Sequence, residues 1–165
     1  MNEIFTRRSI RQYEPRPVEP EKIERILRAA MAAPSAGNQQ PWEFYVVRDR
    51  KKIAELAKSH EYAGCAAGAP AVIVPCVKTD GLRFPELAEI DLAIATENIL
   101  LEIVSQGLGG VWLGIAPLAE RVEKVSAILG LGAGLRAFAL VPLGYPAETK
   151  EPQDRFRPER VHYVD

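Results

Sequence analysis

Hydrophobic residues recur at three- and four-residue spacing between residues 20 and 31, where they would form one face of a helix: Ile23, Ile26, Leu27, Ala30 and Met31. Pro20 stands at the start of this pattern. A helix tolerates proline there because its first N–H groups have no partner within the helix. The spacing predicts a helix of about four turns that buries one face.

Other segments are rich in aromatic and β-branched residues, as strands are. Residues 42–47 and 71–77 have this composition, and we predict a strand in each, with a further strand over the mainly apolar residues 136–143. Pro75 cannot donate a backbone hydrogen bond, so we expect the second strand to lie at a sheet edge or to contain a bulge. A fourth strand is predicted over residues 111–115. The glycines before it fit either a simple turn or a close approach of the backbone to a ligand.

A longer helix is predicted over residues 86–106, and hydrophobic residues surround most of its circumference. Such a helix needs more than one apolar surface to pack against. It would be either a central helix or one shared with a second subunit, and we favour the shared helix, since packing across a two-fold axis would bury the excess. Shorter amphipathic helices are predicted over residues 51–58 and 120–129.

Length and composition restrict the class of protein. A chain of 165 residues, 47% of them hydrophobic, is long enough for one domain and too short for two ordinary ones. Its 21 basic and 22 acidic residues give a net charge of −1, so no overall field favours nucleic acid or an anionic membrane. The longest apolar tract, residues 90–104, contains three carboxylates, which excludes a membrane span.

The cysteines indicate neither a metal site nor a redox pair. Cys65 and Cys76 form no CxxC motif and have no histidines clustered beside them. The first residues run directly into a candidate functional segment with no secretory leader, so we expect a cytoplasmic protein.

Basic residues are concentrated at the two ends of the chain. Arg7, Arg8 and Arg11 flank Ser9, and guanidinium groups with a hydroxyl form a receptor suited to phosphate oxygens. A solvated basic end or a DNA-binding arm would explain the same residues. A second cluster near the C-terminus could meet the first at one phosphate: Arg155, Arg157 and Arg160.

The segment after the first predicted helix suits a flat ligand. Pro34 ends the helix, and the small residues that follow can leave backbone N–H groups exposed. Asn38 and Gln39 carry both donors and acceptors, which suits a pyrimidine-like ring edge, although plain turn chemistry would also explain them. With the arginines, this loop suggests a phosphorylated heterocycle as the ligand.

Five motifs occur here in the order seen in the FMN-dependent nitroreductase family, which the chain resembles over nearly its whole length: RRSIRQY, PSAGNQQPWEF, GLGGVWLG, LVPLGYP and RFRPERVHYV. The resemblance implies an α+β, three-layer α/β/α fold, with a central mixed sheet flanked by helices, in an intertwined homodimer. It also implies one FMN-binding domain over residues 1–165, in which residues 147–165 form an arm that wraps the partner subunit.

The activity implied by the resemblance is that of an FMN-dependent NAD(P)H oxidoreductase. Non-covalent FMN at the dimer interface would take a hydride at N5 from NADH or NADPH and reduce nitroaromatics, quinones or similar small molecules by ping-pong kinetics. The chemistry would belong to the cofactor, with no catalytic side chain. Two alternatives remain: an FMN carrier or sensor without rapid NAD(P)H turnover, and a phosphate- or nucleic-acid-binding module that uses the arginines alone.

The family motifs also assign residues to the flavin. The phosphate would be held by Arg7, Arg8, Ser9, Arg155 and Arg157. Arg11 matches the basic position near the N1 and C2 carbonyl edge of the flavin ring. The other subunit would contribute Pro34, Ser35, Ala36 and Asn38. Backbone groups near N5 and O4 would come from Leu113 and Gly114.

The family's reader of the flavin pyrimidine edge has no clear counterpart between Tyr62 and Phe84, so Gln39 or Lys78 would replace it, or the contact would be absent. Several aromatic residues would line a substrate pocket or pack in the core: Tyr13, Tyr62, Phe84 and Trp112.

Overall fold

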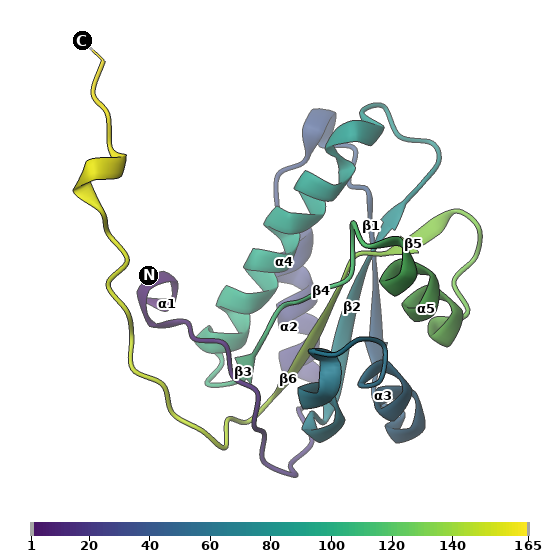
Figure 1. The fold of residues 1–165 in the computed structure, drawn as a ribbon, viewed down its shortest axis with the longest axis horizontal. Helices are drawn as coiled ribbons and strands as arrows, with labels where there is room; N and C mark the ends of the chain where they lie inside the picture. The colour runs from purple at the N-terminus through teal and green to yellow at the C-terminus, as the bar shows by residue number, and fades with distance from the viewer. Residues whose placement is uncertain (1, 165) are drawn as a thin grey trace.

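The computed structural model describes residues 2–164, which form three layers, with helices on both faces of a sheet (Figure 1). The helices are α1 (Glu3–Thr6), α2 (Pro20–Met31), α3 (Arg50–Leu56), α4 (Ala88–Ser105) and α5 (Ala119–Leu129). The strands are β1 (Trp42–Val47), β2 (Ala71–Lys78), β3 (Gly109–Gly110), β4 (Leu113–Gly114), β5 (Leu135–Ala137) and β6 (Ala139–Gly144). The α2 and α4 helices cover one face and α3 and α5 the other, which confirms the predicted three-layer α/β/α arrangement.

The β2 strand lies in the middle of the sheet, and its side chains alternate between two cores. Val72, Val74 and Cys76 pack in the core beneath α3 and α5. Ala71 and Ile73 pack on the opposite face with α2 and α4. Both faces of β2 are therefore buried, which explains why its sequence is continuously apolar instead of alternating with polar residues.

The strand order is β1-β2-β6-β3, with β5 paired to β2 and β4 paired to β6. The strand pairs within residues 2–164 are antiparallel. Parallel pairing is limited to a single bridge between Ser9 and Gly110, so the expected mixed sheet is present only in this reduced form.

Pro75 is not at a sheet edge, so that part of the prediction is wrong. It lies inside β2, opposite Phe44 of β1. On its other side the neighbouring strand changes from β6 to β5, and the break between them falls at Phe138, whose N–H donates to the Pro75 carbonyl at 2.9 Å. The missing donor of proline is accommodated because the interruption occurs in the neighbouring strand.

Two predicted strands are shorter than expected. The segment 136–143 is divided at Phe138 into β5 and β6. The segment 111–115 retains only β4, and Gly109–Gly110 form the separate strand β3. Both β3 and β4 pair with β6, and the chain bends at Val111–Trp112 between the two short pairings. The apolar composition predicted the burial of these residues but not the bends.

The helix predictions agree with the structure in position, whereas two apolar surfaces remain uncovered. In α2, Ile23, Ile26 and Ala30 are buried, but Met31 is exposed, contrary to the predicted face. In α4 one side packs on the sheet and on α2, while Ile90 and Ile94 are 57% and 38% exposed. The α4 helix is therefore not surrounded by the rest of its own chain.

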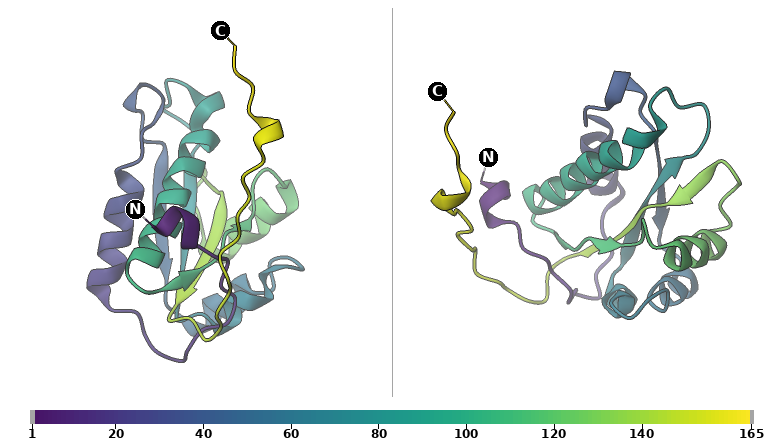
Figure 2. Two further views of the ribbon diagram at one scale, coloured as in Figure 1. Left: turned by 90° about the vertical axis from the view of Figure 1, so that its left-hand side faces the viewer. Right: turned by 45° about the horizontal axis from the view of Figure 1, so that its top comes forward.

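The C-terminal segment leaves the body of the protein and runs past α1 (Figures 1 and 2). Residues 151–164 are all exposed, including Phe156 at 66% and Tyr163 at 88%. A single 3-10 turn, Pro158–Arg160, is its regular structure within the described residues. Because residues 151–164 are all exposed, no burial in the core fixes the path of this part of the arm within one chain.

Candidate functional site: an arginine pocket beside a flat cavity

The N-terminal segment and the base of the arm enclose a cavity of about 380 Å³ that is lined almost entirely by cationic groups. Its lining residues are Arg7, Arg8, Ser9, Arg11, Lys150 and Arg155. The structure thus brings together the two basic clusters that are about 140 residues apart in the sequence. Lys150 was missed because an isolated lysine in a polar arm carries no pattern. Arg157 does not line the cavity; it lies exposed farther along the arm, with its guanidinium donating to the Phe156 carbonyl.

Backbone contacts fix the N-terminal wall of this arginine pocket. Ile10 N–H donates to the Gly110 carbonyl at 3.0 Å, and the Ile10 side chain is buried. A Cβ on Gly109 would lie 2.7 Å from the Ile10 Cβ, so glycine is required for this close approach. The Tyr13 hydroxyl lies 2.7 Å from the Ile10 carbonyl oxygen and anchors the same segment, which explains Tyr13 as a structural residue.

Two hydrogen bonds tie the base of the arm to that wall. Arg11 N–H donates to Glu148 Oε1 at 2.6 Å, and Lys150 Nζ donates to the Ser9 carbonyl at 2.7 Å. The hydrogen bond from Arg11 N–H lowers the pKa of Glu148, and the contact with Lys150 lowers it further. The arm is thus anchored at Glu148 and Lys150, and it becomes exposed directly after them.

The charge of the pocket is only partly compensated. Arg7 pairs with Glu97 at 3.3 Å, and Arg155 donates to Gln153 at 3.2 Å. The side chains of Arg8 and Arg11 form no ion pair or hydrogen bond within residues 2–164, and the buried Nε of Arg8 has no partner there. Gathered cations without acceptors are unfavourable, and an anion with several oxygens would satisfy them. The donor set therefore fits a phosphate group.

Arg11 also lines a second cavity, of about 530 Å³, and is the lining residue that this cavity shares with the arginine pocket. We call this second cavity the flat cavity, because planar aromatic side chains and small residues line it. Three segments form it: residues 60–65, residues 112–114 and Arg121 at the start of α5. A Cβ on Gly64 or Gly114 would meet nothing within 4 Å, so both glycines border open space. The two cavities together offer a cationic end and a flat end, linked by Arg11.

The segment 63–68 was missed as part of the site by the sequence analysis. Ala63 and Ala66 pack into the core, which leaves Gly64 and Cys65 to line the flat cavity. Burial raises the pKa of the Cys65 thiol, so it is protonated at neutral pH. The available signal was the run of small residues directly before a buried strand.

The loop from Pro34 to Asn38 lies at the N-terminal end of α4, where Ala36 N–H donates to Asp91, whereas the N-terminal segment meets β3, which follows the other end of α4 (Figure 1). Within one chain the structure does not bring this loop to the arginines. The loop is conformationally unusual, with positive φ at Gly37 (55°), Asn38 (56°) and Gln40 (47°). Non-glycine residues adopt such angles at a cost and need surrounding contacts to hold them.

Those contacts come from a buried carboxylate and an amide. Asp91 of α4 is 4% exposed and accepts hydrogen bonds from Ala36 N–H (3.0 Å) and Gln39 Nε2 (2.8 Å). The Gln39 amide also donates to the Phe84 carbonyl and accepts from Phe84 N–H. Both N–H groups of the Gln39 amide are thus used inside the protein, and its oxygen accepts from Phe84 N–H, so the structure gives Gln39 a role in holding this loop.

Two other candidates from the sequence lie outside the arginine pocket and the flat cavity. Lys78, the second candidate for the pyrimidine edge, pairs with Glu43 at 3.4 Å and lines neither cavity. Phe84 also lies outside them, whereas Tyr62 and Trp112 line the flat cavity.

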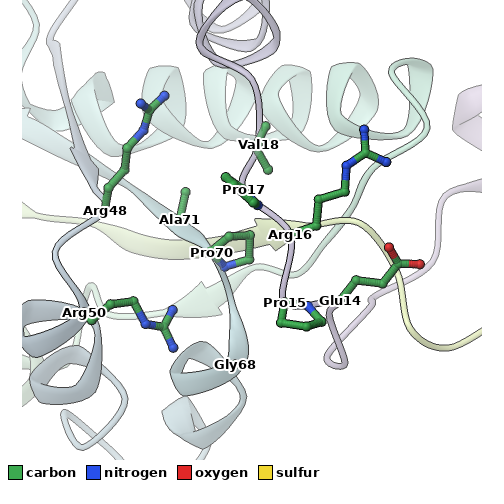
Figure 3. A pocket seen from close by; sticks show the side chains of 10 residues that line it. All are labelled: Glu14, Pro15, Arg16, Pro17, Val18, Arg48, Arg50, Gly68, Pro70 and Ala71. Carbon is green, nitrogen blue, oxygen red and sulfur yellow. The ribbon is translucent and has the colours of Figure 1, made fainter.

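A separate cavity of about 450 Å³ lies beside the start of α2 (Figure 3). Its floor is apolar, and its arginines are spread around it instead of converging on one point. Arg50 is held by the Ala67 and Ala69 carbonyls, and Arg16 by Glu19. None of the residues expected to bind flavin lines it, so we do not place the site there.

Across residues 2–164, no helix has both the length and the apolar character needed to cross a membrane.

Comparison with known proteins identifies the fold. The chain matches the nitroreductase family over residues 4–61 and 59–145. It is 44% identical over 163 residues to an Archaeoglobus fulgidus protein named "Putative NADH dehydrogenase/NAD(P)H nitroreductase", covering 96% of this chain and 94% of that protein. A solved structure from Clostridium acetobutylicum shares 44% identity with a TM-score of 0.95, covering 99% of both chains. The structure of an "FMN-dependent Nitroreductase" from Clostridium difficile R20291 matches with a TM-score of 0.92 at 26% identity, covering 99% of this chain and 98% of that one.

The three-layer fold is thus that of a known class of α+β proteins, and the sequence match extends over most of the chain. This chain belongs to the nitroreductase family.

Proposed function

We propose that this protein is an FMN-dependent NAD(P)H oxidoreductase that reduces nitroaromatics, quinones or similar small acceptors. One observation carries the proposal: Arg11 lines both the cationic arginine pocket, whose donors suit a phosphate, and the flat cavity, which is bordered by open glycines. FMN has the same two parts, a phosphate and a planar ring. The family membership and the FMN-dependent relative from Clostridium difficile support the same assignment.

The phosphate end would be held by the residues of the arginine pocket, with Arg8 supplying a buried donor that has no partner within residues 2–164. Arg7, Ser9 and Arg155 line this pocket and would act as expected on the phosphate, and Lys150 would join them. Arg157 would reach the phosphate only if the exposed arm changes its path on a second subunit. Charge-assisted hydrogen bonds of this kind contribute about 1.5–3 kcal/mol each.

The flat end would be oriented by Arg11 and by the backbone at Leu113 and Gly114. A fixed cation beside the ring stabilises negative charge that develops there. When bound, FMN supplies the redox chemistry, which takes a hydride from NADH or NADPH and passes it to the acceptor in ping-pong order. The residues of the chain position the ring and exclude water; none is required as a covalent catalyst.

The functional unit would be a homodimer with FMN at its interface. The exposed apolar residues of α4 would be covered by a second copy, whose arm (residues 147–165) would wrap this subunit. The partner would then place its own loop, Pro34, Ser35, Ala36 and Asn38, against the flavin. This explains why the loop is far from the arginines in a single chain.

An anaerobic titration tests the proposal. The purified protein is loaded with FMN and titrated separately with NADH and NADPH while the flavin absorbance is recorded. Bleaching within seconds supports the reductase and identifies the donor. Flavin that binds without bleaching would support the alternative of a carrier or sensor, and failure to bind FMN would overturn both.

A further inference from the structure

The flat cavity contains more chemistry than flavin binding uses. With Arg11 assigned to the flavin ring, two charged residues remain among those that line it: Arg121 and Glu61. Both line the cavity together with Tyr62. Glu61 comes from the segment after α3, and Arg121 comes from the first turn of α5. This wall adjoins Gly114, the proposed flavin contact, and is therefore where a second substrate would meet the ring.

Arg121 is a fixed cation on this wall. Its side chain is only 21% exposed, and its Nη1 donates to the Gly114 carbonyl at 3.0 Å. Glu61 approaches it to 3.7 Å, which is too long for a hydrogen bond, and the Glu61 side chain is 69% exposed. Within residues 2–164 the Arg121 side chain donates no other hydrogen bond, and its ion pair is this long contact with Glu61, so further donors can serve another acceptor. A planar guanidinium fork matches the two oxygens of a carboxylate.

Tyr62 presents an aromatic surface next to that cation. The residue is 67% exposed, and Arg121 Cζ lies 5.9 Å from its ring centroid. Tyr62 N–H donates to His60 Nδ1 at 3.2 Å, and the two rings lie 6.3 Å apart. Burial lowers the pKa of His60, which keeps the imidazole neutral and able to accept this hydrogen bond. His60 thus positions the backbone of Tyr62.

We propose that Tyr62 and Arg121 form an acceptor subsite that favours planar aromatic molecules bearing a carboxylate. The aromatic ring of the acceptor would pack on Tyr62, and its carboxylate would pair with Arg121. Glu61 would oppose such acceptors by its negative charge. This inference rests on the proposed function, because the subsite matters for turnover only where flavin occupies the rest of the cavity.

Binding of a non-reducible probe tests the subsite without turnover. Benzoate and benzamide have the same shape and differ in charge, and each is titrated into the FMN-loaded protein while the flavin absorbance is followed. We expect benzoate to bind more tightly than benzamide. Arg121→Gln should weaken benzoate binding by about tenfold and leave benzamide nearly unaffected, whereas Arg121→Lys should retain part of the preference.

Glu61→Gln provides a test in the opposite direction. Removing this carboxylate should strengthen benzoate binding by about threefold, an effect that damage to the fold would not produce. Lys51→Gln is the matched control, since Lys51 is an exposed cation on α3 that does not line the cavity. It should change neither affinity.

Turnover of 4-nitrobenzoate and 4-nitrobenzamide gives the corresponding selectivity, measured as the ratio of their kcat/KM values. The ratio should exceed one, fall by about tenfold in Arg121→Gln and rise in Glu61→Gln. A wild-type protein that does not distinguish benzoate from benzamide, or an Arg121→Gln variant with an unchanged preference, overturns the subsite. If NADH and NADPH both fail to bleach bound FMN, the proposed function fails, while the benzoate titration still decides the subsite separately.

Discussion

The arginine pocket and the loop around Asp91 are both polar, but they differ in how completely their groups are satisfied. Asp91 and Gln39 use their hydrogen-bonding groups within the protein, on Ala36 and Phe84. In the pocket, Arg8 has a buried donor without a partner, and Arg8 and Arg11 lack ion pairs within the described chain. A complete network maintains a structure, whereas an incomplete one indicates a place for a ligand.

The largest expected effect comes from the incomplete network. The double variant Arg8→Ala/Arg155→Ala should weaken FMN binding by about a hundredfold or more, because two charge-assisted hydrogen bonds are lost. Its stability should be unchanged or slightly higher, since like charges are removed from one cavity. Calorimetric titration with FMN and a thermal melt without FMN measure both quantities. Stoichiometric flavin in the purified double variant would disprove the phosphate assignment.

A substitution in the complete network around Asp91 should instead lower the stability of the protein. Asp91→Ala leaves Ala36 N–H without its acceptor and removes one of the two acceptors of the Gln39 amide, at a cost of about 2–4 kcal/mol in the free energy of unfolding. Urea unfolding of the flavin-free protein gives this value. Asp49→Ala is a suitable control because Asp49 is an exposed helix cap with one such bond, to Lys52 N–H, worth about 1 kcal/mol. Equal losses for the two variants would contradict the difference between the regions.

A glycine connects the pocket to the fold. Gly109→Ala places a methyl group 2.7 Å from the Ile10 Cβ, and the N-terminal wall must shift to accommodate it. We expect a loss of about 1–3 kcal/mol in stability together with weaker FMN binding. Gly114→Ala serves as the comparison, because a Cβ at Gly114 meets nothing within 4 Å. This variant should therefore have the same free energy of unfolding as the wild-type protein. Wild-type stability in Gly109→Ala would show that the close approach is not required.

The smallest expected effect concerns the pKa of Glu148, which anchors the base of the arm. Because Arg11 N–H lowers the folded-state pKa of Glu148, this contact stabilises the protein above the ordinary carboxyl pKa of 4.5 and is lost as the pH falls through the lower folded value. Proteolysis of the arm should therefore accelerate on acidification below that range. Glu148→Gln should remove the pH dependence, and an unaltered acid response in that variant would show that another group is responsible.

Local patterns predicted the helices and strands well. The predictions failed at residues whose environment depends on contacts with distant parts of the sequence. The spacing of Ile23, Ile26 and Ala30 was sufficient to locate α2, because one helix determines its own periodicity. Pro75 was expected at an edge or a bulge, because the neighbouring strand that accommodates it by an interruption at Phe138 is 63 residues away in the sequence. The same limit applies to Gln39, whose partners Phe84 and Asp91 lie on a distant segment.

The candidate site shows the same division. The cluster of arginines near residue 8 was visible in the sequence, but its charge balance depends on Glu97 and Lys150, which only the fold brings near. Cys65 and Gly64 had no chemical pattern to identify them. The choice between Arg155 and Arg157 could not be made from the sequence, because both belong to an exposed arm with no periodicity.

The most direct test of the central claim is the affinity of the flavin-free protein for FMN relative to riboflavin, which has the same ring and side chain without the phosphate. If the arginine pocket is a phosphate site, FMN should bind about a hundredfold or more tightly than riboflavin, and the preference should disappear in Arg8→Ala/Arg155→Ala. Equal affinity of the wild-type protein for the two flavins would contradict the claim that these arginines bind phosphate.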